Sequence, residues 1–247
     1  MISKNQIKFV RQLEQKKYRQ KEGLFVAEGP KVVGDLLRHG WQPKALYATS
    51  AWEGMGSMTD SGGIQVSDEE LQRLSFLQHP QQVLAVFPLP ANRQMPPLKQ
   101  GRLYLALDGV QDPGNLGTII RIADWFGIDA IYCSTDTADV WNPKVVQATM
   151  GSIARVSLYY TDLPQMLKSA EVPVYGTLLD GEDIYSQSLS SDGIIVMGNE
   201  GNGLSAPVRE LVDRKLLIPS FNSSPDMAES LNVAIATAIT CSEFRRR

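Results

Sequence analysis

The chain has 247 residues, 43% hydrophobic and 21% charged, with a formal net charge of −3. No apolar run approaches the roughly 18 residues that a membrane span needs, so membrane, fibrous and disordered classes are excluded. The first residues enter a charged stretch without an apolar signal region, and two cysteines and two histidines are too few for a disulfide framework or a zinc cluster. We therefore expect a soluble, cytoplasmic protein without a metal site, built from one large domain or two modest ones.

The charge is unevenly distributed along the chain. Residues 1–50 carry ten Lys or Arg against four Asp or Glu, a local charge of +6, and the remainder carries −9. A basic patch on an otherwise acidic protein is typical of a surface that binds a polyanion such as RNA. A solvated helix face is the alternative that the charge alone leaves open.

The first 90 residues alternate helical and strand-like patterns, which predicts a small α/β domain. Four prolines and a glycine between Phe87 and Tyr104 then exclude helix and sheet interior. We predict a domain at 1–90, a linker at 91–101 and a second domain at 102–247. In chain order the first domain is expected to hold a basic helix at 4–21, a strand at 24–27, a helix after Pro30, a strand at 45–48, a loop at 53–63, a strand at 64–66, a helix opened by a Ser67/Glu70 capping box and a strand at 83–87.

The second domain alternates apolar strand-like runs with helical patterns, which indicates a mostly parallel sheet with helices on both faces. In such sheets ligands bind outside the carboxyl ends of the strands, so the loops that follow them are the places to inspect. The predicted strands are 103–107, 130–133, 155–158, 174–178, 194–197 and 215–218.

The first of these loops, residues 108–117, leads into a helix predicted at 118–126. Pro113-Gly114 predicts a turn, and Asn115 is a favoured N-cap. Arg121 lies six residues further and falls on a different part of the helix surface. A helix N-terminus with an Asn and a nearby Arg suits an oxyanion or a phosphate. Alternatively, Asn115 only caps the helix and Arg121 pairs with a surface acid.

The second loop contains three glycines and an acid directly after a strand. In Gly198-Asn199-Glu200-Gly201-Asn202-Gly203-Leu204-Ser205 the glycines leave room for a ligand against bare backbone, and Glu200 supplies a carboxylate acceptor. The spacing differs from G-x-G-x-x-G, which disfavours a dinucleotide site. A tight turn that caps the next helix through Ser205 would explain the glycines but not the acid.

The third loop follows Pro219 and leads into a C-terminal helix. Ser230 and Asn232 stand at the mouth of this helix and could be plain caps. Beyond Asn232 the residues are nearly all small or apolar, so the helix is expected to be buried against the sheet or against another chain.

Three motifs in this order resemble the SpoU (TrmH-like) family of SPOUT RNA methyltransferases. They are Asp-Pro-Gly-Asn-Leu-Gly-Thr-Ile-Ile-Arg at 112–121 with Asn-Pro-Lys-Val-Val-Gln-Ala-Thr-Met-Gly at 142–151, the run 198–205, and Ser-Leu-Asn-Val at 230–233. The resemblance covers about 101–247. The N-terminal domain is similar, more loosely, to the L30e-like substrate-binding domain that many members carry.

The resemblance implies a fold, a reaction and an assembly. The family folds as an α/β sheet whose C-terminal segment forms a trefoil knot, a rare exception to unknotted topology. Members bind S-adenosyl-L-methionine in the knot, methylate a ribose 2'-oxygen in RNA and are homodimers with the last helix near the interface. No metal is implied, because the sulfonium is already a good leaving group. Carried over, the catalytic residues are Asn115, Arg121, Glu200, Ser230 and Asn232, and the cofactor-binding residues are Thr177, Leu178, Gly198, Gly201, Ile218 and Leu231.

Arg121 is the residue expected to act at the 2'-hydroxyl. A guanidinium stays protonated below pH ~12, so we assign it positioning and electrostatics first and proton removal second. The chain departs from the family between Pro219 and Ser230, where Ser220 replaces the usual Met and the link is longer and contains Pro225. Cofactor affinity or the shape of the dimer edge could therefore differ.

Three functions fit the sequence. The leading one is an RNA 2'-O-methyltransferase that depends on S-adenosyl-L-methionine. Ribosomal RNA is its favoured substrate, because a separate N-terminal domain suits recognition of a folded RNA, and transfer RNA is the second choice. A non-catalytic RNA-binding or ribosome-assembly protein is the alternative from another class. A nicotinamide-dependent oxidoreductase is disfavoured by the glycine spacing.

Overall fold

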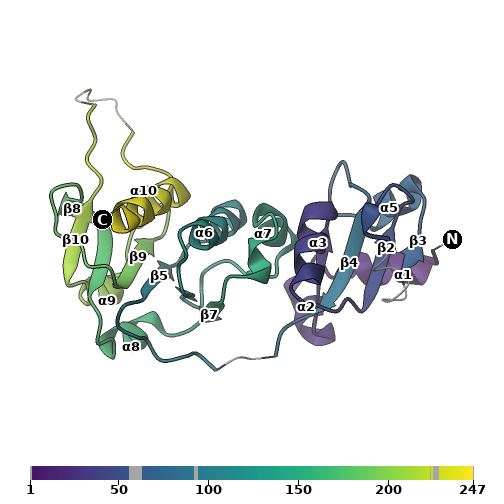
Figure 1. The fold of residues 1–247 in the computed structure, drawn as a ribbon, viewed down its shortest axis with the longest axis horizontal. Coiled ribbons are helices and arrows are strands. Elements are labelled where there is room, and N and C mark those ends of the chain that lie inside the picture. The colour runs from purple at the N-terminus through teal and green to yellow at the C-terminus, as the bar shows by residue number, and fades with distance from the viewer. Residues whose placement is uncertain (1, 56–62, 92–93, 223, 225–227, 247) are drawn as a thin grey trace. The chain divides into compact units, whose positions relative to one another are not determined.

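The computed structural model describes residues 2–55, 63–91, 94–222, 224 and 228–246, and the chain divides into two units (Figure 1). The first unit consists of Met1–Arg93 and Asp139–Arg155, and the second of Gln94–Ala138 and Val156–Arg247. A stretch from the middle of the chain thus contributes to the first unit. Pro225 and part of the loops at 53–63 and 220–229 lie outside the described residues. No helix in the described parts is long and apolar enough to cross a membrane.

The first unit contains a mixed sheet in the order β1-β4-β2-β3, in which β4 is antiparallel to both of its neighbours and β2 is parallel to β3. The predicted alternation of helices and strands is confirmed. The strands are β1 (Leu24–Glu28), β2 (Ala45–Ala48), β3 (Ile64–Gln65) and β4 (Val83–Pro88). The helices are α1 (Lys4–Gln12), α2 (Lys16–Glu22), α3 (Pro30–Arg38), α5 (Asp68–Leu74) and α7 (Pro143–Ala148), with 3-10 turns η1 (Glu53–Met55) and η2 (Ser152–Ala154).

Local signals explain most of these boundaries. The predicted capping box of Ser67 and Glu70 is present at the start of α5. The helical stretch predicted near 4–21 is present as two helices, because the chain breaks between α1 and α2. The buried Arg19 side chain donates to the carbonyl oxygens of Leu13 at 2.9 Å and Glu14 at 2.6 Å, which satisfies carbonyls that a continuing helix would have used.

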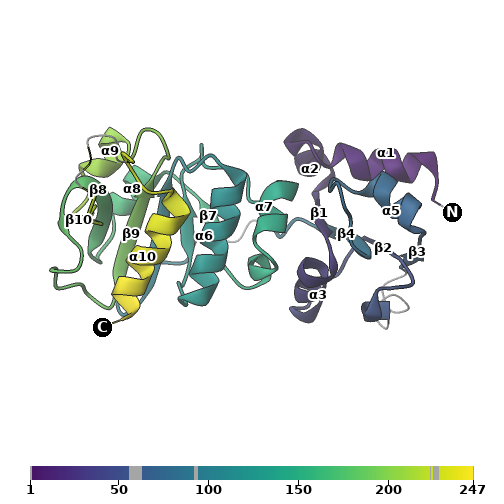
Figure 2. The same ribbon diagram turned by 90° about the horizontal axis from the view of Figure 1, so that it is seen from above.

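The second unit contains a six-stranded sheet in the order β10-β8-β9-β5-β6-β7. Every pairing among its described strands is parallel, so the predicted α/β class is confirmed. In both views α6 and α10 lie on one face of the sheet and α8 and α9 on the other (Figures 1 and 2). The strands are β5 (Leu103–Asp108), β6 (Ile131–Cys133), β7 (Leu158–Tyr160), β8 (Val174–Asp183), β9 (Gly193–Gly198) and β10 (Arg214–Leu217), and the helices are α6 (Pro113–Trp125), α8 (Leu163–Lys168), α9 (Ala206–Arg209) and α10 (Val233–Arg245).

The core of the second unit follows the two-residue period of its strands. Tyr104 and Ala106 of β5 and Ile194 and Val196 of β9 join one buried cluster with the apolar residues of α8 and α9. The strand predicted at 155–158 is displaced to Leu158–Tyr160, because Arg155 instead ends the 3-10 turn η2. The sheet therefore places the carboxyl ends of β5, β8, β9 and β10 at one edge.

Candidate active site

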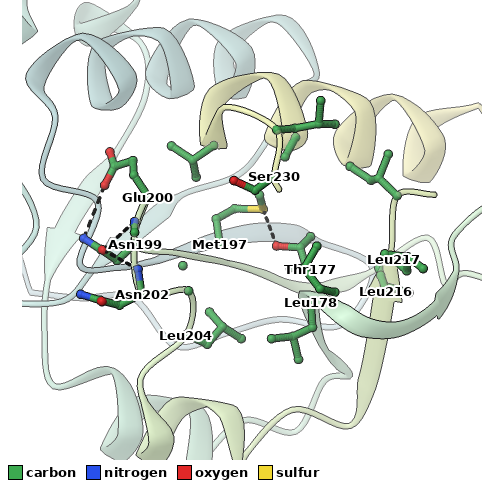
Figure 3. A pocket seen from close by; sticks show the side chains of 18 of the residues that line it. Thr177, Leu178, Met197, Asn199, Glu200, Asn202, Leu204, Leu216, Leu217 and Ser230 are labelled. Atoms are coloured by element: carbon green, nitrogen blue, oxygen red, sulfur yellow. Dashed lines mark hydrogen bonds between the residues drawn. The ribbon is translucent and has the colours of Figure 1, made fainter. Parts of the chain in front are cut away.

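A cavity of about 570 Å³ lies at this edge of the second unit (Figure 3). Its walls come from the ends of β8, β9 and β10, from the loop after β9 and from the start of α10. The structure brings together all the residues predicted to bind a cofactor, together with two of the predicted catalytic residues. The cavity is lined by Thr177, Leu178, Gly198, Gly201, Ile218 and Leu231, and by Glu200 and Ser230.

A chain of side-chain hydrogen bonds joins three of the predicted catalytic residues. The Asn115 amide Nδ2 donates to Glu200 Oε1 at 2.9 Å, and the Asn232 amide Nδ2 donates to Asn115 Oδ1 at 2.9 Å. These residues are 85 and 117 positions apart along the chain. The three loops that the sequence analysis singled out therefore meet at one place.

Helix capping at α6 differs from the prediction. The helix begins at Pro113, and its N-cap is Asp112, whose carboxylate accepts from the Asn115 backbone N–H at 2.8 Å. The prediction that Asn115 caps a helix starting at Thr118 is wrong, because the Asp112 carboxylate and the N1 proline start the helix earlier. The Asn115 amide is thereby left available to Glu200.

Asn232 has two functions in the structure. Its Oδ1 accepts from the backbone N–H groups of Ala234 at 3.0 Å and Ile235 at 3.3 Å, so it is the predicted N-cap of α10. Its Nδ2 is the donor to Asn115. Capping fixes the orientation of the amide, and this orientation aims the donor at the site.

Glu200 is held by neutral donors. Besides Asn115, its carboxylate accepts from the backbone N–H groups of Gln111 and Asp112, both at 3.3 Å. Partial burial alone would raise the pKa of Glu200, but the hydrogen bonds from Asn115 and from these backbone groups outweigh it and lower the pKa. Among the described residues no Lys or Arg side chain forms an ion pair with this carboxylate, so Glu200 keeps a net negative charge beside the cavity.

Arg121 and Ser230 stand apart from the hydrogen-bonded chain. Arg121 is exposed on α6, and in the described part of the protein it has no hydrogen bond or salt bridge. The suggested pairing of Arg121 with a surface acid is thus not seen among these residues. Ser230 lines the cavity, and its hydroxyl has no partner among the same residues. Both side chains have free hydrogen-bonding groups that a ligand could use.

The loop after β9 folds back on the strand and needs its glycines. Asn199 and Gly203 form a β-bridge, and the Asn199 Oδ1 accepts from the N–H groups of Gly201 and Asn202, both at 3.0 Å. A Cβ on Gly198 would lie 2.3 Å from the carbonyl carbon of Gly203. The glycines therefore permit a tight turn, and this turn presents Glu200.

The backbone of β8 leaves its ladder where it borders the cavity. Gly176 is opposite Lys215 of β10, but the next residue of β10, Leu216, is opposite Glu182. Residues 177–181 consequently have no partner on β10 in this register, and pairing with β9 ends at Gly176. We call this segment the β8 bulge; it contributes Thr177, Leu178, Leu179 and Asp180 to the cavity wall.

These features fit S-adenosylmethionine. The volume lies in the range of small-molecule pockets, roughly 300–1,000 Å³. The wall combines apolar side chains with unpaired strand backbone and a free serine hydroxyl, which suits a flat heterocycle joined to polar ribose and amino-acid groups. Among the described residues no cluster of His, Cys, Asp or Glu could hold a metal ion.

Two residues that shape the site, Asp108 and Asn199, were not among the predicted site residues. Asp108 at the end of β5 accepts from the Ser205 N–H at 2.6 Å, and the Asn199 amide donates to the Gly109 carbonyl at 2.7 Å. Asp108 directly follows the strand predicted at 103–107, and Asn199 comes two residues after the end of the strand predicted at 194–197; this position was the available signal. For the β8 bulge the available signal was Asp180-Gly181, a pair typical of turns and bulges, which follows the strand predicted at 174–178.

Comparison with known proteins shows which family the chain belongs to. Residues 102–242 match the model of the SpoU rRNA Methylase family, and residues 4–85 match a model described as an MRM3-like substrate binding domain. The Bacillus subtilis 23S rRNA (guanosine(2553)-2'-O)-methyltransferase RlmP is 34% identical over 98% of this chain and 97% of its own length.

Two solved structures resemble the whole chain. One, described as a putative RNA methyltransferase of the TrmH family from Porphyromonas gingivalis, is 43% identical with a TM-score of 0.87, covering 100% of this chain and 99% of its own. The other is an AdoMet-bound rRNA methyltransferase from Sinorhizobium meliloti, 33% identical with a TM-score of 0.85, covering 100% of this chain and 96% of its own. The chain belongs to the SpoU rRNA methylase family.

Proposed function

We propose that this chain transfers a methyl group from S-adenosylmethionine to a ribose 2'-hydroxyl of ribosomal RNA. The observation that carries the proposal is the hydrogen-bonded chain of Asn115, Glu200 and Asn232 at the mouth of a cavity of cofactor size. Relatives across nearly the full length are named as 23S rRNA 2'-O-methyltransferases, which favours ribosomal over transfer RNA.

The cavity is the proposed binding site of the cofactor. S-adenosylmethionine supplies, when bound, a methyl group on a sulfonium that leaves as a neutral thioether. The β8 bulge and the glycines of the loop after β9 offer backbone groups to the nucleoside, and Ser230 offers its hydroxyl. The backbone and apolar contacts are proposed for Thr177, Leu178, Gly198, Gly201, Ile218 and Leu231.

The chain's own polar groups are proposed to hold the RNA. Glu200 stays ionised because its pKa is lowered, and it orients the Asn115 amide beside the site. Arg121 has a guanidinium without a partner among the described residues, and it suits an RNA phosphate next to the target ribose. As the methyl group moves to the 2'-oxygen, the hydroxyl proton leaves to solvent, and a preset cation stabilises the negative charge that develops on the oxygen without accepting that proton itself.

Methylation of unmodified ribosomal RNA by the purified protein tests this function. With S-adenosylmethionine, we expect methyl groups at a defined ribose 2'-oxygen, detected by resistance of the adjacent bond to alkaline cleavage. Arg121→Ala should bind the cofactor normally in calorimetry and lose about 10²-fold or more in methyl transfer. Full activity of this variant would refute the role of Arg121. Absence of both cofactor binding and methylation in the wild type would refute the function, and methylation of transfer RNA alone would reassign the substrate.

We also propose that residues 1–90, in the first unit, form a substrate-binding domain that contacts the RNA. The ten basic residues of the first fifty are not equivalent, because Arg19, Lys31 and Arg38 are in ion pairs with Asp139 and Asp35. The exposed lysines of α1 and α2 remain available for phosphates: Lys4, Lys8, Lys16, Lys17 and Lys21. RNA affinity should therefore fall steeply with salt while cofactor affinity does not, and equal salt dependence of the two would contradict this division.

Two further parts of the proposal concern the second unit. We propose a homodimer through the helical face formed by α6 and α10, supported by Trp125 at 85% exposure and Ile235 at 52%. Light scattering at micromolar concentration should give twice the monomer mass, and a monomer would refute it. The trefoil-knotted path of the segment after β10, which the family resemblance implies, belongs to the same proposal, and a crystal structure of the protein would test it.

A further inference from the structure

An ion-pair cluster of Asp180, Arg209 and Lys215 joins the β8 bulge to α9 and β10. Asp180, within the bulge, accepts through Oδ2 from Arg209 of α9 at 2.5 Å and from Lys215 of β10 at 3.0 Å. These two hydrogen bonds, led by that from Lys215, lower the pKa of Asp180 to about 2, so the carboxylate is charged at any physiological pH. One side chain thus connects the bulge to two regular elements.

The position of this cluster ties it to the cavity. Asp180 and Arg209 both line the cavity, and Arg209 has the one cationic side chain among the described lining residues. At the end of the bulge, a Cβ on Gly181 would lie 2.7 Å from the carbonyl carbon of Leu216. The bulge therefore approaches β10 closely at Gly181, and the adjacent Asp180 holds the same end to β10 and α9 through ion pairs.

A backbone segment without ladder partners needs another restraint if it is to present its N–H and C=O groups in one arrangement. An isolated exposed ion pair contributes little to the stability of a protein. Here one carboxylate is shared by two cations that stand on a helix and a strand, so the network restrains the bulge from two directions. A segment that is already restrained before binding loses less conformational entropy when a ligand binds, so the ligand binds more tightly.

We propose that Asp180 is a positioning residue for the cofactor site, which holds the β8 bulge in its binding arrangement through Arg209 and Lys215. The inference rests on the proposed function, since the cofactor is the ligand that the bulge would contact. Asp180 acts through the backbone of Thr177 and Leu178. Its effect must therefore be independent of the charge of the ligand.

The test is calorimetric titration of the full chain with S-adenosylmethionine, which has a net charge of +1, and with S-adenosylhomocysteine, which is neutral overall. Asp180→Asn should raise the Kd of both ligands by the same factor, about three- to tenfold. Lys215→Met should raise both by a smaller common factor, and Lys215→Arg should keep both near the wild-type values. Without ligand, hydrogen exchange of the 177–181 amides should be faster in Asp180→Asn.

The matched control is Asp129→Asn, which removes the charge of another exposed pair of the second unit, Arg102 and Asp129 at 2.9 Å. Neither residue lines the cavity, so its Kd values should match the wild type. Unchanged Kd values in Asp180→Asn, or a loss confined to the cationic ligand, would overturn the inference alone. Wild-type protein that binds neither ligand would overturn the proposed function and this inference with it.

Discussion

Two carboxylates, Asp35 in the first unit and Glu200 in the second, illustrate opposite uses of a negative charge. The side chain of Asp35 is only 3% exposed, and it forms ion pairs with Lys31 at 3.2 Å, with Arg155 at 3.3 Å and with Arg38. Glu200 is bound by amide and backbone N–H groups. A carboxylate surrounded by cations is neutralised, whereas one held by dipoles keeps its charge.

The pKa values of both groups are lowered, but by different partners. For Asp35, burial acts to raise the pKa and is outweighed by hydrogen bonds from Lys31, Arg155 and Arg38. For Glu200, burial is outweighed by hydrogen bonds from neutral groups. The direction of a pKa shift therefore does not separate a structural acid from one proposed to act at the site. The two carboxylates differ instead in the charge of their partners and in the cavity beside Glu200.

Glu200→Gln has the largest expected effect in this comparison. Both carboxylate oxygens of Glu200 accept hydrogen bonds, and the NH2 group of a Gln in its place would face a donor. The side chain would have to move, and Asn115 would then lose its fixed orientation. We expect single-turnover methyl transfer to fall by about 10²- to 10³-fold, with cofactor Kd changed only a few-fold. Glu229→Gln is the matched control, because Glu229 lines the same cavity and forms no hydrogen bond with the other described residues. Equal losses in both variants would show that only the charge of the cavity matters.

Asp35→Asn should act on stability instead. Removing one side of a buried ion pair leaves charges unpaired, but Lys31 and Arg38 are more than half exposed and can rehydrate. We expect the first unit to lose about 1–3 kcal/mol in its free energy of unfolding, measured by urea titration. Cofactor affinity at neutral pH should be unchanged. A variant as stable as the wild type would show that the cluster contributes nothing net.

The smallest effect is the pH dependence of that stability difference. Because folding lowers the pKa of Asp35, its contribution is fully present above the ordinary value of about 3.9 and is lost as the pH falls through the folded pKa. The difference between wild type and Asp35→Asn should be constant above about pH 5 and shrink below about pH 4. If the difference grew on acidification, the charged form of Asp35 would destabilise the folded protein.

Local patterns were sufficient for much of the fold and for selecting the loops that meet at the candidate site. Apolar runs predicted the strands of both sheets within a few residues, except for β7 and the long β8, and Ser67 with Glu70 predicted the start of α5. These signals depend on neighbours within a few positions, which a sequence displays directly. The rule that ligands bind at the carboxyl ends of parallel strands then selected the loops that contain Asn115, Glu200 and Asn232.

What the sequence by itself determined is therefore the class of fold, the order of most elements and the residue types at the strand ends. Only the tertiary structure decided how the polar groups pair. Asp112 rather than Asn115 caps α6, Asp139 pairs with Arg19, and Asp180 meets Lys215 across a shifted register. Each pairing depends on which backbone donors and charged groups from distant parts of the chain lie next to each other in the fold. Local periodicity does not predict these pairs, because hydrogen bonds and ion pairs form only between groups that folding brings within about 3 Å.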